Sequence, residues 1–121
     1  MYDSENIFAK ILRGDIPNNT VHEDSDVLAF ADIQPQKPVH VLVIPKGEYV
    51  SFDDFSSKAG AEAVGRFFEK VGMIAREKLN LSSNGYRLVT NIGNHGGQEV
   101  PHFHVHILAG EPVGALVAQA A

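Results

Sequence analysis

Three histidines alternate with large apolar residues in one short segment, and this pattern constrains the fold more than any other feature of the chain. Residues 102–108 read HFHVHIL. Successive side chains of an extended backbone point to opposite sides. We therefore expect a strand with the three imidazoles on one face, while Phe103, Val105 and Ile107 enter a core on the other. Imidazole changes protonation near neutral pH and serves as a nucleophile, a base or a metal ligand. The histidine row (His102, His104 and His106) therefore indicates a functional site.

Metal binding is the competing interpretation of the histidine row. His-x-His on a strand can supply two zinc ligands, and a third ligand would complete a catalytic site. The absence of cysteine and of a His-Glu-x-x-His helix argues against zinc, but His22, His40 or His95 could supply the third ligand. The spacing alone leaves the metal alternative open.

Length and charge limit the classes of protein to consider. A chain of 121 residues is expected to form a single domain over residues 1–121. The formal charge is -5 and no basic block occurs, so we expect neither nucleic acid nor an anionic membrane as a partner. Zero cysteines fit a reducing compartment, and neither a signal peptide nor a membrane span is evident. We therefore expect a cytoplasmic protein.

A short amphipathic helix is expected near the N-terminus. Asp3 or Ser4 can cap it, and Gly14 is a natural stop. Its apolar face would be formed by Ile7, Phe8, Ile11 and Leu12.

The remaining pattern predicts an α+β fold. A strand apolar on both faces is expected at 39–44, and one long helix is expected from about 57 to 79. Shorter strands are expected near 20–23, 27–32 and 86–91, besides the strand that carries the histidine row. The prediction is an antiparallel sheet of about five strands with two helices packed against it.

A glycine-rich loop at residues 93–98 leads directly into the histidine row. Glycines let backbone N–H groups approach an anion, and Gln98 adds a side-chain amide. Phosphate is the anion expected beside three imidazoles. If a carbonyl holds the proton of His104 on one ring nitrogen, the other nitrogen is free to attack phosphorus.

The seven residues 102–108 match the motif His-φ-His-φ-His-φ-φ, where φ is apolar, and the chain thereby resembles the histidine triad family. The likeness covers roughly residues 5 to 110. The segments that resemble its Hint branch are 6–11, 16–17, 28–33, 35–46, 85–87 and 96–98.

This resemblance implies a nucleotide-binding hydrolase with the HIT-like fold that works as a homodimer. Its substrates would be purine nucleoside 5′-phosphoramidates and aminoacyl-adenylate-like compounds, which it cleaves to the nucleoside monophosphate. The resemblance implies no metal and no other cofactor.

The family's site residues carry over by position. His104 would be the nucleophile that forms a nucleotidyl-histidine intermediate, while His102, His106 and His40 would shape the phosphate and leaving-group environment. Asp32 would accept hydrogen bonds from the ribose hydroxyls. The purine would be enclosed by Ile7, Phe8, Ile11, Phe30, Ile33 and Leu42, and the phosphate site would be lined by Asn91, Gly97, Gln98 and Glu99.

Three departures from the family's pattern bear on function. Glu99 stands where animal members have serine, and a carboxylate about 4 Å from a phosphate charge would cost roughly 4 kcal/mol at an effective dielectric constant near 20. We therefore expect its side chain to point away and residues 97–99 to act through backbone N–H groups. The tail 111–121 lacks the tryptophan-containing ending of those members, which leaves leaving-group selectivity open. Asn6 and Ala9 replace the paired cysteines of some bacterial relatives, so no structural zinc is expected.

Two alternatives to the phosphoramidase hypothesis remain. One is a non-catalytic nucleotide-binding or scaffold protein, against which the intact histidine row argues. The other is a metal-dependent phosphohydrolase that uses the same imidazoles.

Overall fold

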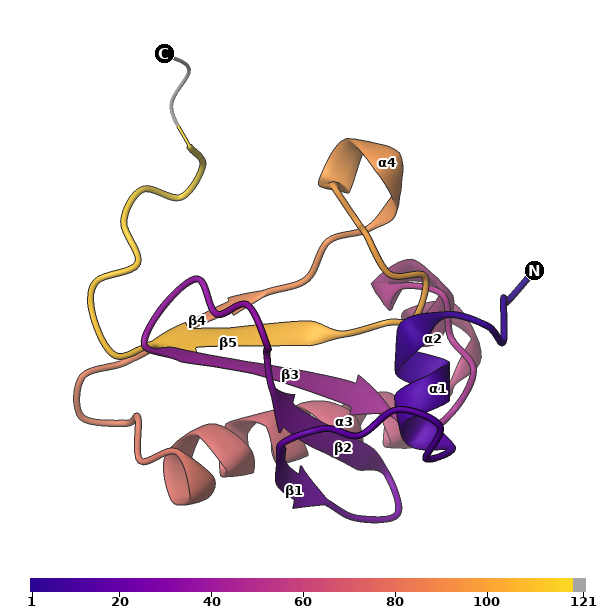
Figure 1. The fold of residues 1–121 in the computed structure, drawn as a ribbon, viewed down its shortest axis with the longest axis horizontal. Coiled ribbons are helices and arrows are strands. Elements are labelled where there is room, and N and C mark those ends of the chain that lie inside the picture. The colour runs from indigo at the N-terminus through magenta and orange to yellow at the C-terminus, as the bar shows by residue number, and fades with distance from the viewer. Residues whose placement is uncertain (119–121) are drawn as a thin grey trace.

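A five-stranded antiparallel sheet forms the centre of the protein. The computed structural model describes residues 1–118, and its strands lie in the order β1-β2-β3-β5-β4 (Figure 1). The strands are β1 Thr20–Glu23, β2 Val27–Ala31, β3 Val39–Pro45, β4 Arg87–Val89 and β5 Val105–Ala109. Every neighbouring pair is antiparallel, as the sequence predicted. β3 lies at the centre and is buried beyond its first residue, which confirms the prediction of a covered central strand.

The helices differ from the two that the sequence predicted. The elements are α1 Ile7–Leu12, α2 Phe52–Lys58, α3 Ala61–Met73, the π-helix η1 Ile74–Lys78 and α4 Gly93–Gly96. The long helix expected at about 57–79 is present as α3 and η1, but its predicted start is wrong because the chain breaks at Gly60, whose φ of 90° lies outside the helical region. α4 occupies part of the predicted glycine-rich loop and stands away from the sheet (Figure 1).

The N-terminal helix is capped by Asn6 rather than by Asp3 or Ser4. The Asn6 side chain accepts a hydrogen bond from the N–H of Ala9, which satisfies one of the free donors of the first turn. Asp3 supports this cap, because its backbone carbonyl accepts a hydrogen bond from the Asn6 side chain.

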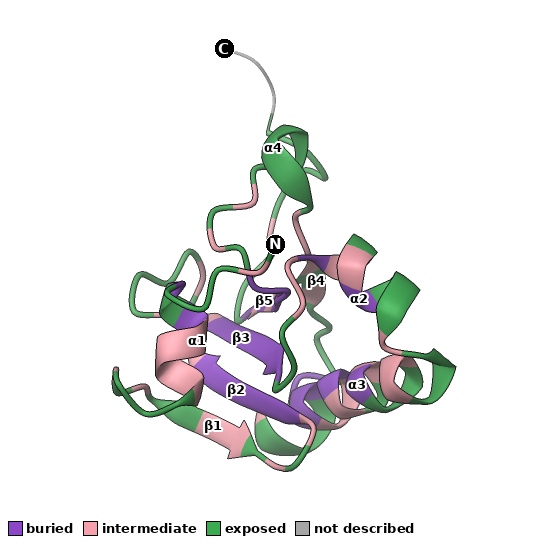
Figure 2. Ribbon diagram, turned by 90° about the vertical axis from the view of Figure 1, so that its right-hand side faces the viewer, coloured by how far each residue is buried: buried purple, intermediate pink, exposed green. Residues whose placement is uncertain are grey.

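The two faces of the sheet bury separate apolar clusters. Val27 and Ala29 of β2 pack with residues of α2 and α3, whereas Leu28 and Phe30 pack with Phe8 of α1. This alternation follows from the two-residue period of a strand. Figure 2 shows α1 beside the buried strands β2 and β3. The sheet thus carries a main core on one face and a smaller cluster under α1 on the other.

The histidine strand is shorter than predicted, although its two faces are as predicted. Phe103, Val105 and Ile107 belong to the main core, which confirms the expected alternation. β5 begins only at Val105, so His102 and His104 precede the sheet ladder. In the register of β3 and β5, Leu42 lies opposite His106.

No helix within residues 1–118 combines the length and the apolar character needed to cross a membrane.

An ionic cluster joins the β1–β2 turn to α3. Lys70 Nζ lies 2.7 Å from Asp26 Oδ2 and 3.1 Å from Asp24 Oδ1. The other oxygen of Asp24 lies 2.7 Å from His22 Nε2, and its Oδ1 also accepts from the backbone N–H groups of Asp26 and Val27. Burial by itself would raise the pKa of the Asp24 carboxyl, but these hydrogen bonds together hold the pKa well below its usual range.

We predict that Asp24→Asn lowers the free energy of unfolding at neutral pH by about 1–3 kcal/mol, because the amide loses the charged hydrogen bonds. A depressed pKa in the folded state stabilises the protein above the unfolded value of about 4 and stops doing so as pH falls through the folded value. The difference between variant and native chain should therefore shrink in acid. Urea unfolding across the pH range measures this difference, and Asp53→Asn at an exposed position of α2 is the control. A difference in unfolding free energy that does not change with pH would contradict the assignment.

Candidate active site

A cavity of about 430 Å³ brings the predicted site residues together on the α1 side of the sheet. We call it the histidine cavity. Residues from α1, the end of β2, β3, the loop after α4 and β5 line it. The predicted residues in its lining are Ile7, Phe8, Ile11, Phe30, Asp32, Ile33, His40, Leu42, Asn91, Gly97, Glu99, His104 and His106. Two predicted residues, His102 and Gln98, lie outside the lining.

The lining also includes residues that sequence reasoning had not assigned to the site. These are Ile16, Pro17, Asn18, Ala31, Gln34, Gln36 and Val100. Ile16 and Pro17 form one of the segments that resemble the family, so this likeness could have placed them at the site. No lysine or arginine occurs among the lining residues, so donors for an anion must come from imidazoles, amides and backbone.

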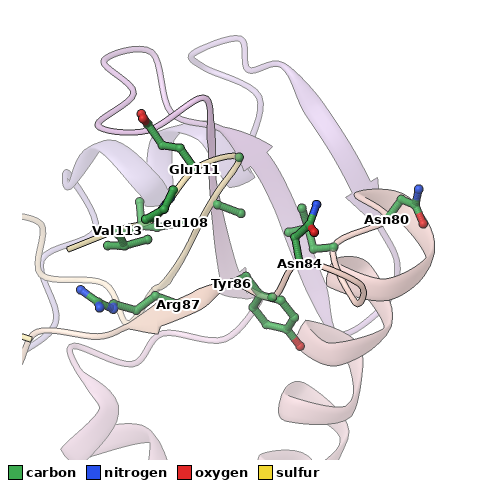
Figure 3. A pocket seen from close by; sticks show the side chains of 12 residues that line it. Asn80, Asn84, Tyr86, Arg87, Leu108, Glu111 and Val113 are labelled. Carbon is green, nitrogen blue, oxygen red and sulfur yellow. The ribbon is translucent and has the colours of Figure 1, made fainter. Parts of the chain in front are cut away.

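A larger cavity of about 670 Å³ lies between residues 80–87 and residues 108–113. No histidine lines it. Figure 3 shows the Arg87 side chain pointing away from Tyr86 and Asn84, and its guanidinium donates to the carbonyls of Gly114 and Ala115. The smaller histidine cavity is therefore the candidate site, because His40, His104 and His106 converge there with Asp32.

His104 presents an unprotonated nitrogen to the histidine cavity. Its Nδ1 lies 2.7 Å from the carbonyl oxygen of His102, and since a carbonyl only accepts, Nδ1 carries the proton. Nε2 then holds the lone pair, as expected from the sequence. Every buried side-chain nitrogen and oxygen within residues 1–118 has a hydrogen-bond partner. Nε2 of His104 has no such partner among these residues, so this atom is not buried. It is therefore open to the cavity.

Burial lowers the pKa of His104 below the ordinary value, against the hydrogen bond to the His102 carbonyl and the charges of Asp32 and Glu99, which raise it. The imidazole is therefore neutral at neutral pH. A neutral imidazole with one fixed proton is the form able to act as a nucleophile.

His40 and His106 form a hydrogen-bonded chain beside His104. The N–H of Gln36 donates to His40 Nδ1 at 3.0 Å, so His40 carries its proton on Nε2. That nitrogen lies 2.9 Å from His106 Nδ1 and donates to it. His106 must then carry its own proton on Nε2. The rings of His104 and His106 lie 5.0 Å apart between centroids, so the two imidazoles are direct neighbours.

The surroundings keep this chain uncharged. Burial, together with the neighbouring His104 and His40, lowers the pKa of His106 to about 4, against the charge of Asp32, which raises it. Burial likewise lowers the pKa of His40, although Asp32, whose carboxylate oxygen lies 3.5 Å from His40 Nε2, raises it. Both residues are donors rather than cations at neutral pH.

A family model of the HIT domain matches residues 13–113. The chain belongs to the HIT family. This HIT protein is 47% identical over 118 residues to an uncharacterized 13.2 kDa HIT-like protein of Azospirillum brasilense, covering 98% of this chain and 96% of the relative. It is 43% identical over 114 residues to the purine nucleoside phosphoramidase of Escherichia coli strain K12, covering 94% of each chain.

Solved structures agree with this assignment. A histidine triad protein from Clostridium difficile matches with a TM-score of 0.85 and 40% identity, over 97% of this chain and 100% of that chain. A HIT family hydrolase from Clostridium thermocellum matches with a TM-score of 0.85 and 34% identity, over 96% of this chain and 99% of that chain. The family resemblance drawn from the sequence is confirmed.

His102 holds a different place from its two neighbours in the row. It is fully buried, and its Nε2 lies 3.0 Å from the Pro45 carbonyl oxygen while its Nδ1 lies 2.6 Å from the Tyr2 hydroxyl. Burial lowers its pKa to about 4. Both ring nitrogens are occupied, so in this HIT protein His102 contributes to the site chiefly through its backbone carbonyl.

The side chain of Gln98 braces the loop that precedes the row. Its Oε1 accepts from the N–H of Gly93, and its Nε2 donates to the carbonyls of Val50 and Val100. The amide is thus used within the protein. Any contact of residues 97–99 with a phosphate would come from the backbone.

Glu99 lines the histidine cavity, and its charge raises the pKa of His104. That its side chain points away from a bound phosphate stays a prediction. The side chain is exposed, which weakens its repulsion of an anion through solvent screening.

Three residues of this HIT protein could in principle hold a metal ion. Ligand atoms of Asp32, His40 and His106 lie within 4.8 Å of one another. A metal on His40 Nε2 would require its proton on Nδ1, where it would face the N–H of Gln36. The donor set therefore fits the hydrogen-bonded chain better than a metal.

We predict that kcat/KM for a phosphoramidate stays level as pH falls to about 6.5, the ordinary histidine value, and declines only below it. The reason is that the active form of His104 is neutral and its pKa is lowered by burial. Glu99→Gln should move this acid limb to still lower pH, because the carboxylate raises the same pKa.

With an uncharged leaving amine, Glu99→Gln should change turnover by less than about tenfold, or under roughly 1.4 kcal/mol. Glu111→Gln, a change at an exposed acid outside the histidine cavity, is the matched control. A hundredfold loss in Glu99→Gln would mean that the carboxylate itself takes part in the chemistry.

Proposed function

We propose that this HIT protein hydrolyses purine nucleoside 5′-phosphoramidates at the P–N bond, releasing the nucleoside monophosphate and an amine. The observation that carries the proposal is the open, unprotonated Nε2 of His104, whose Nδ1 proton is held by the His102 carbonyl. The relative from Escherichia coli, a purine nucleoside phosphoramidase with 43% identity, supports the same reaction.

The apolar part of the histidine cavity suits a flat base. Ile33 and Ile7 are exposed at 84% and 44%, which leaves apolar surface that a bound purine would cover. Phe8, Phe30 and Leu42 lie behind them in the buried cluster under α1. A cavity of about 430 Å³ falls within the range of small-molecule sites, about 300–1,000 Å³.

Asp32 stands where it could select for ribose. Its Oδ1 accepts from the N–H of Gln34 at 2.8 Å, which fixes the carboxylate at the cavity wall. A carboxylate has about four lone-pair sites, so the group can accept from both ribose hydroxyls while keeping its backbone donor.

The proposed reaction has two displacements at phosphorus. In the first, the lone pair of His104 Nε2 forms a bond to phosphorus as the bond to the amine breaks, and the amine leaves with a proton from solvent at the cavity mouth. His106 Nε2–H donates to a non-bridging phosphoryl oxygen throughout. In the second, water attacks phosphorus, His104 leaves as a neutral imidazole, and the water returns one proton to solvent.

The cation formed on His104 during the first displacement has suitable neighbours. The His102 carbonyl accepts its Nδ1–H, and the charges of Asp32 and Glu99 both favour a positive imidazole. The intermediate is therefore stabilised relative to a histidine in an uncharged apolar wall.

We predict that His104→Ala lowers phosphoramidase turnover by at least about a thousandfold while nucleotide binding and the fold survive. The side chain lies on the cavity side rather than in the main core, so its removal should leave the sheet intact. His95→Ala, which alters an exposed histidine of α4 outside the cavity lining, is the control. Near-normal turnover in His104→Ala would reject the nucleophile assignment.

Metal independence is a separate expectation, because the hydrogen-bonding of His40 opposes a metal at Asp32, His40 and His106. Dialysis against a chelator should leave kcat within about twofold, and elemental analysis of the active protein should find less than one metal per chain. Activity lost on chelation and restored by zinc would instead support metal-assisted hydrolysis.

We also propose that the protein is a two-fold homodimer. β4 is an edge strand that pairs only with β5 among the described strands, and Tyr86, Leu88 and Ile92 expose apolar surface along it. An unpaired edge with apolar side chains favours association with a second copy. We propose that α3 contributes to the same contact.

Leu88→Glu should therefore convert a dimer into monomers, because two like charges would meet at an isologous contact. Light scattering at micromolar concentration measures the mass directly. Thr20→Glu on β1, the opposite edge of the sheet, should leave the mass unchanged. A native protein that is monomeric under these conditions would overturn the dimer proposal.

A further inference from the structure

The N-terminal segment reaches the histidine row through one hydroxyl group. The Tyr2 oxygen lies 2.6 Å from Nδ1 of His102, which is 100 residues away along the chain. The two rings meet edge to face with centroids 5.7 Å apart. Neither residue lines the histidine cavity, so this contact stands behind the site.

The direction of this hydrogen bond is fixed by the partner on the other side of the ring. The Pro45 carbonyl 3.0 Å from His102 Nε2 can only accept, so Nε2 carries the proton and Nδ1 is an acceptor. Tyr2 must therefore donate. Burial raises the pKa of the Tyr2 hydroxyl above its ordinary value, so the donor keeps its proton at neutral pH.

The backbone of residues 102–104 needs such an anchor because it lies before the sheet ladder. β5 starts at Val105. Contacts outside the ladder hold the preceding residues: the N–H of Phe103 donates to the Tyr49 carbonyl at 2.7 Å, and Thr90 Oγ1 donates to the His104 carbonyl at 2.8 Å. His102 is held by the two hydrogen bonds of its ring, to the Pro45 carbonyl and to the Tyr2 hydroxyl. Its own carbonyl accepts the hydrogen bond from His104 Nδ1.

We propose that Tyr2 is a positioning residue for the nucleophile: its hydroxyl fixes the ring of His102, and the His102 carbonyl thereby keeps His104 in the Nδ1–H tautomer with Nε2 toward the substrate. The inference rests on the proposed function for its effect on turnover. Its structural part, the tautomers of two histidines, stands apart from any activity.

The test is Tyr2→Phe, which keeps the ring against His102 and removes only the hydroxyl. Long-range proton–nitrogen correlation spectra report the tautomer of each imidazole. The native protein should show His102 as the Nε2–H form and His104 as the Nδ1–H form. In Tyr2→Phe, His102 should keep the Nε2–H form, because the Pro45 carbonyl still accepts its proton. His104 should show a mixture of tautomers, because the His102 backbone has lost one of its anchors, and kcat should fall about tenfold or more with KM little changed, because the purine wall is untouched.

Tyr49→Phe is the matched control, since it removes a hydroxyl from a tyrosine whose ring packs edge to face on Phe55 of the main core, outside the lining of the histidine cavity. It should leave both the tautomers and kcat as they are. An unchanged tautomer of His104 in Tyr2→Phe, or an unchanged kcat despite an altered tautomer, would overturn the proposal. A native protein without phosphoramidase activity would reject the proposed function instead, and the spectra would still decide whether Tyr2 fixes the two rings.

Discussion

The hydrogen bond from His104 Nδ1 to the His102 carbonyl is the interaction on which the site depends. At 2.7 Å it commits the single proton of a neutral imidazole to one nitrogen and leaves the other as a lone pair. The carbonyl comes from a residue two positions earlier, so the proposed nucleophile and its orienting group belong to one short segment. No carboxylate is needed to hold the ring, and the imidazole stays less basic than in an Asp–His pair.

Burial keeps the histidines of the site neutral. The pKa values of His40, His102, His104 and His106 are all lowered, with burial as the main cause in each. Four neutral imidazoles can share a small volume without the repulsion that four cations would feel. Each proton then has one defined place, set by an acceptor carbonyl or a donor amide. The charges of Asp32 and Glu99 act in the opposite direction on His104, but burial outweighs them in the free protein.

The sequence predicted the parts of this arrangement that arise from local periodicity. Alternation placed Phe103, Val105 and Ile107 in the core, and the apolar run of β3 indicated a central strand. The family resemblance predicted that Asp32, His40 and the α1 residues belong to one site, and all of them line the histidine cavity. No local pattern in the sequence could have predicted this.

Contacts between distant segments were beyond sequence reasoning. The Tyr2 hydroxyl meets His102 across 100 residues, and no periodicity marks an isolated tyrosine near a terminus. The predicted long helix began near residue 57, before Gly60, because hydrophobic periodicity does not register a single backbone angle. Gln98 was predicted to line the phosphate site because a loop amide is a good donor. In the structure its Nε2 already donates to the carbonyls of Val50 and Val100.

The stereochemical course at phosphorus tests the central claim most directly. A nucleoside phosphoramidate made chiral at phosphorus by sulfur is hydrolysed in oxygen-18 water, and the configuration of the product is determined. Two in-line displacements, first by His104 and then by water, each invert the centre, so this account predicts overall retention. Overall inversion would mean that water attacks the substrate directly and that no nucleotidyl-histidine lies on the pathway.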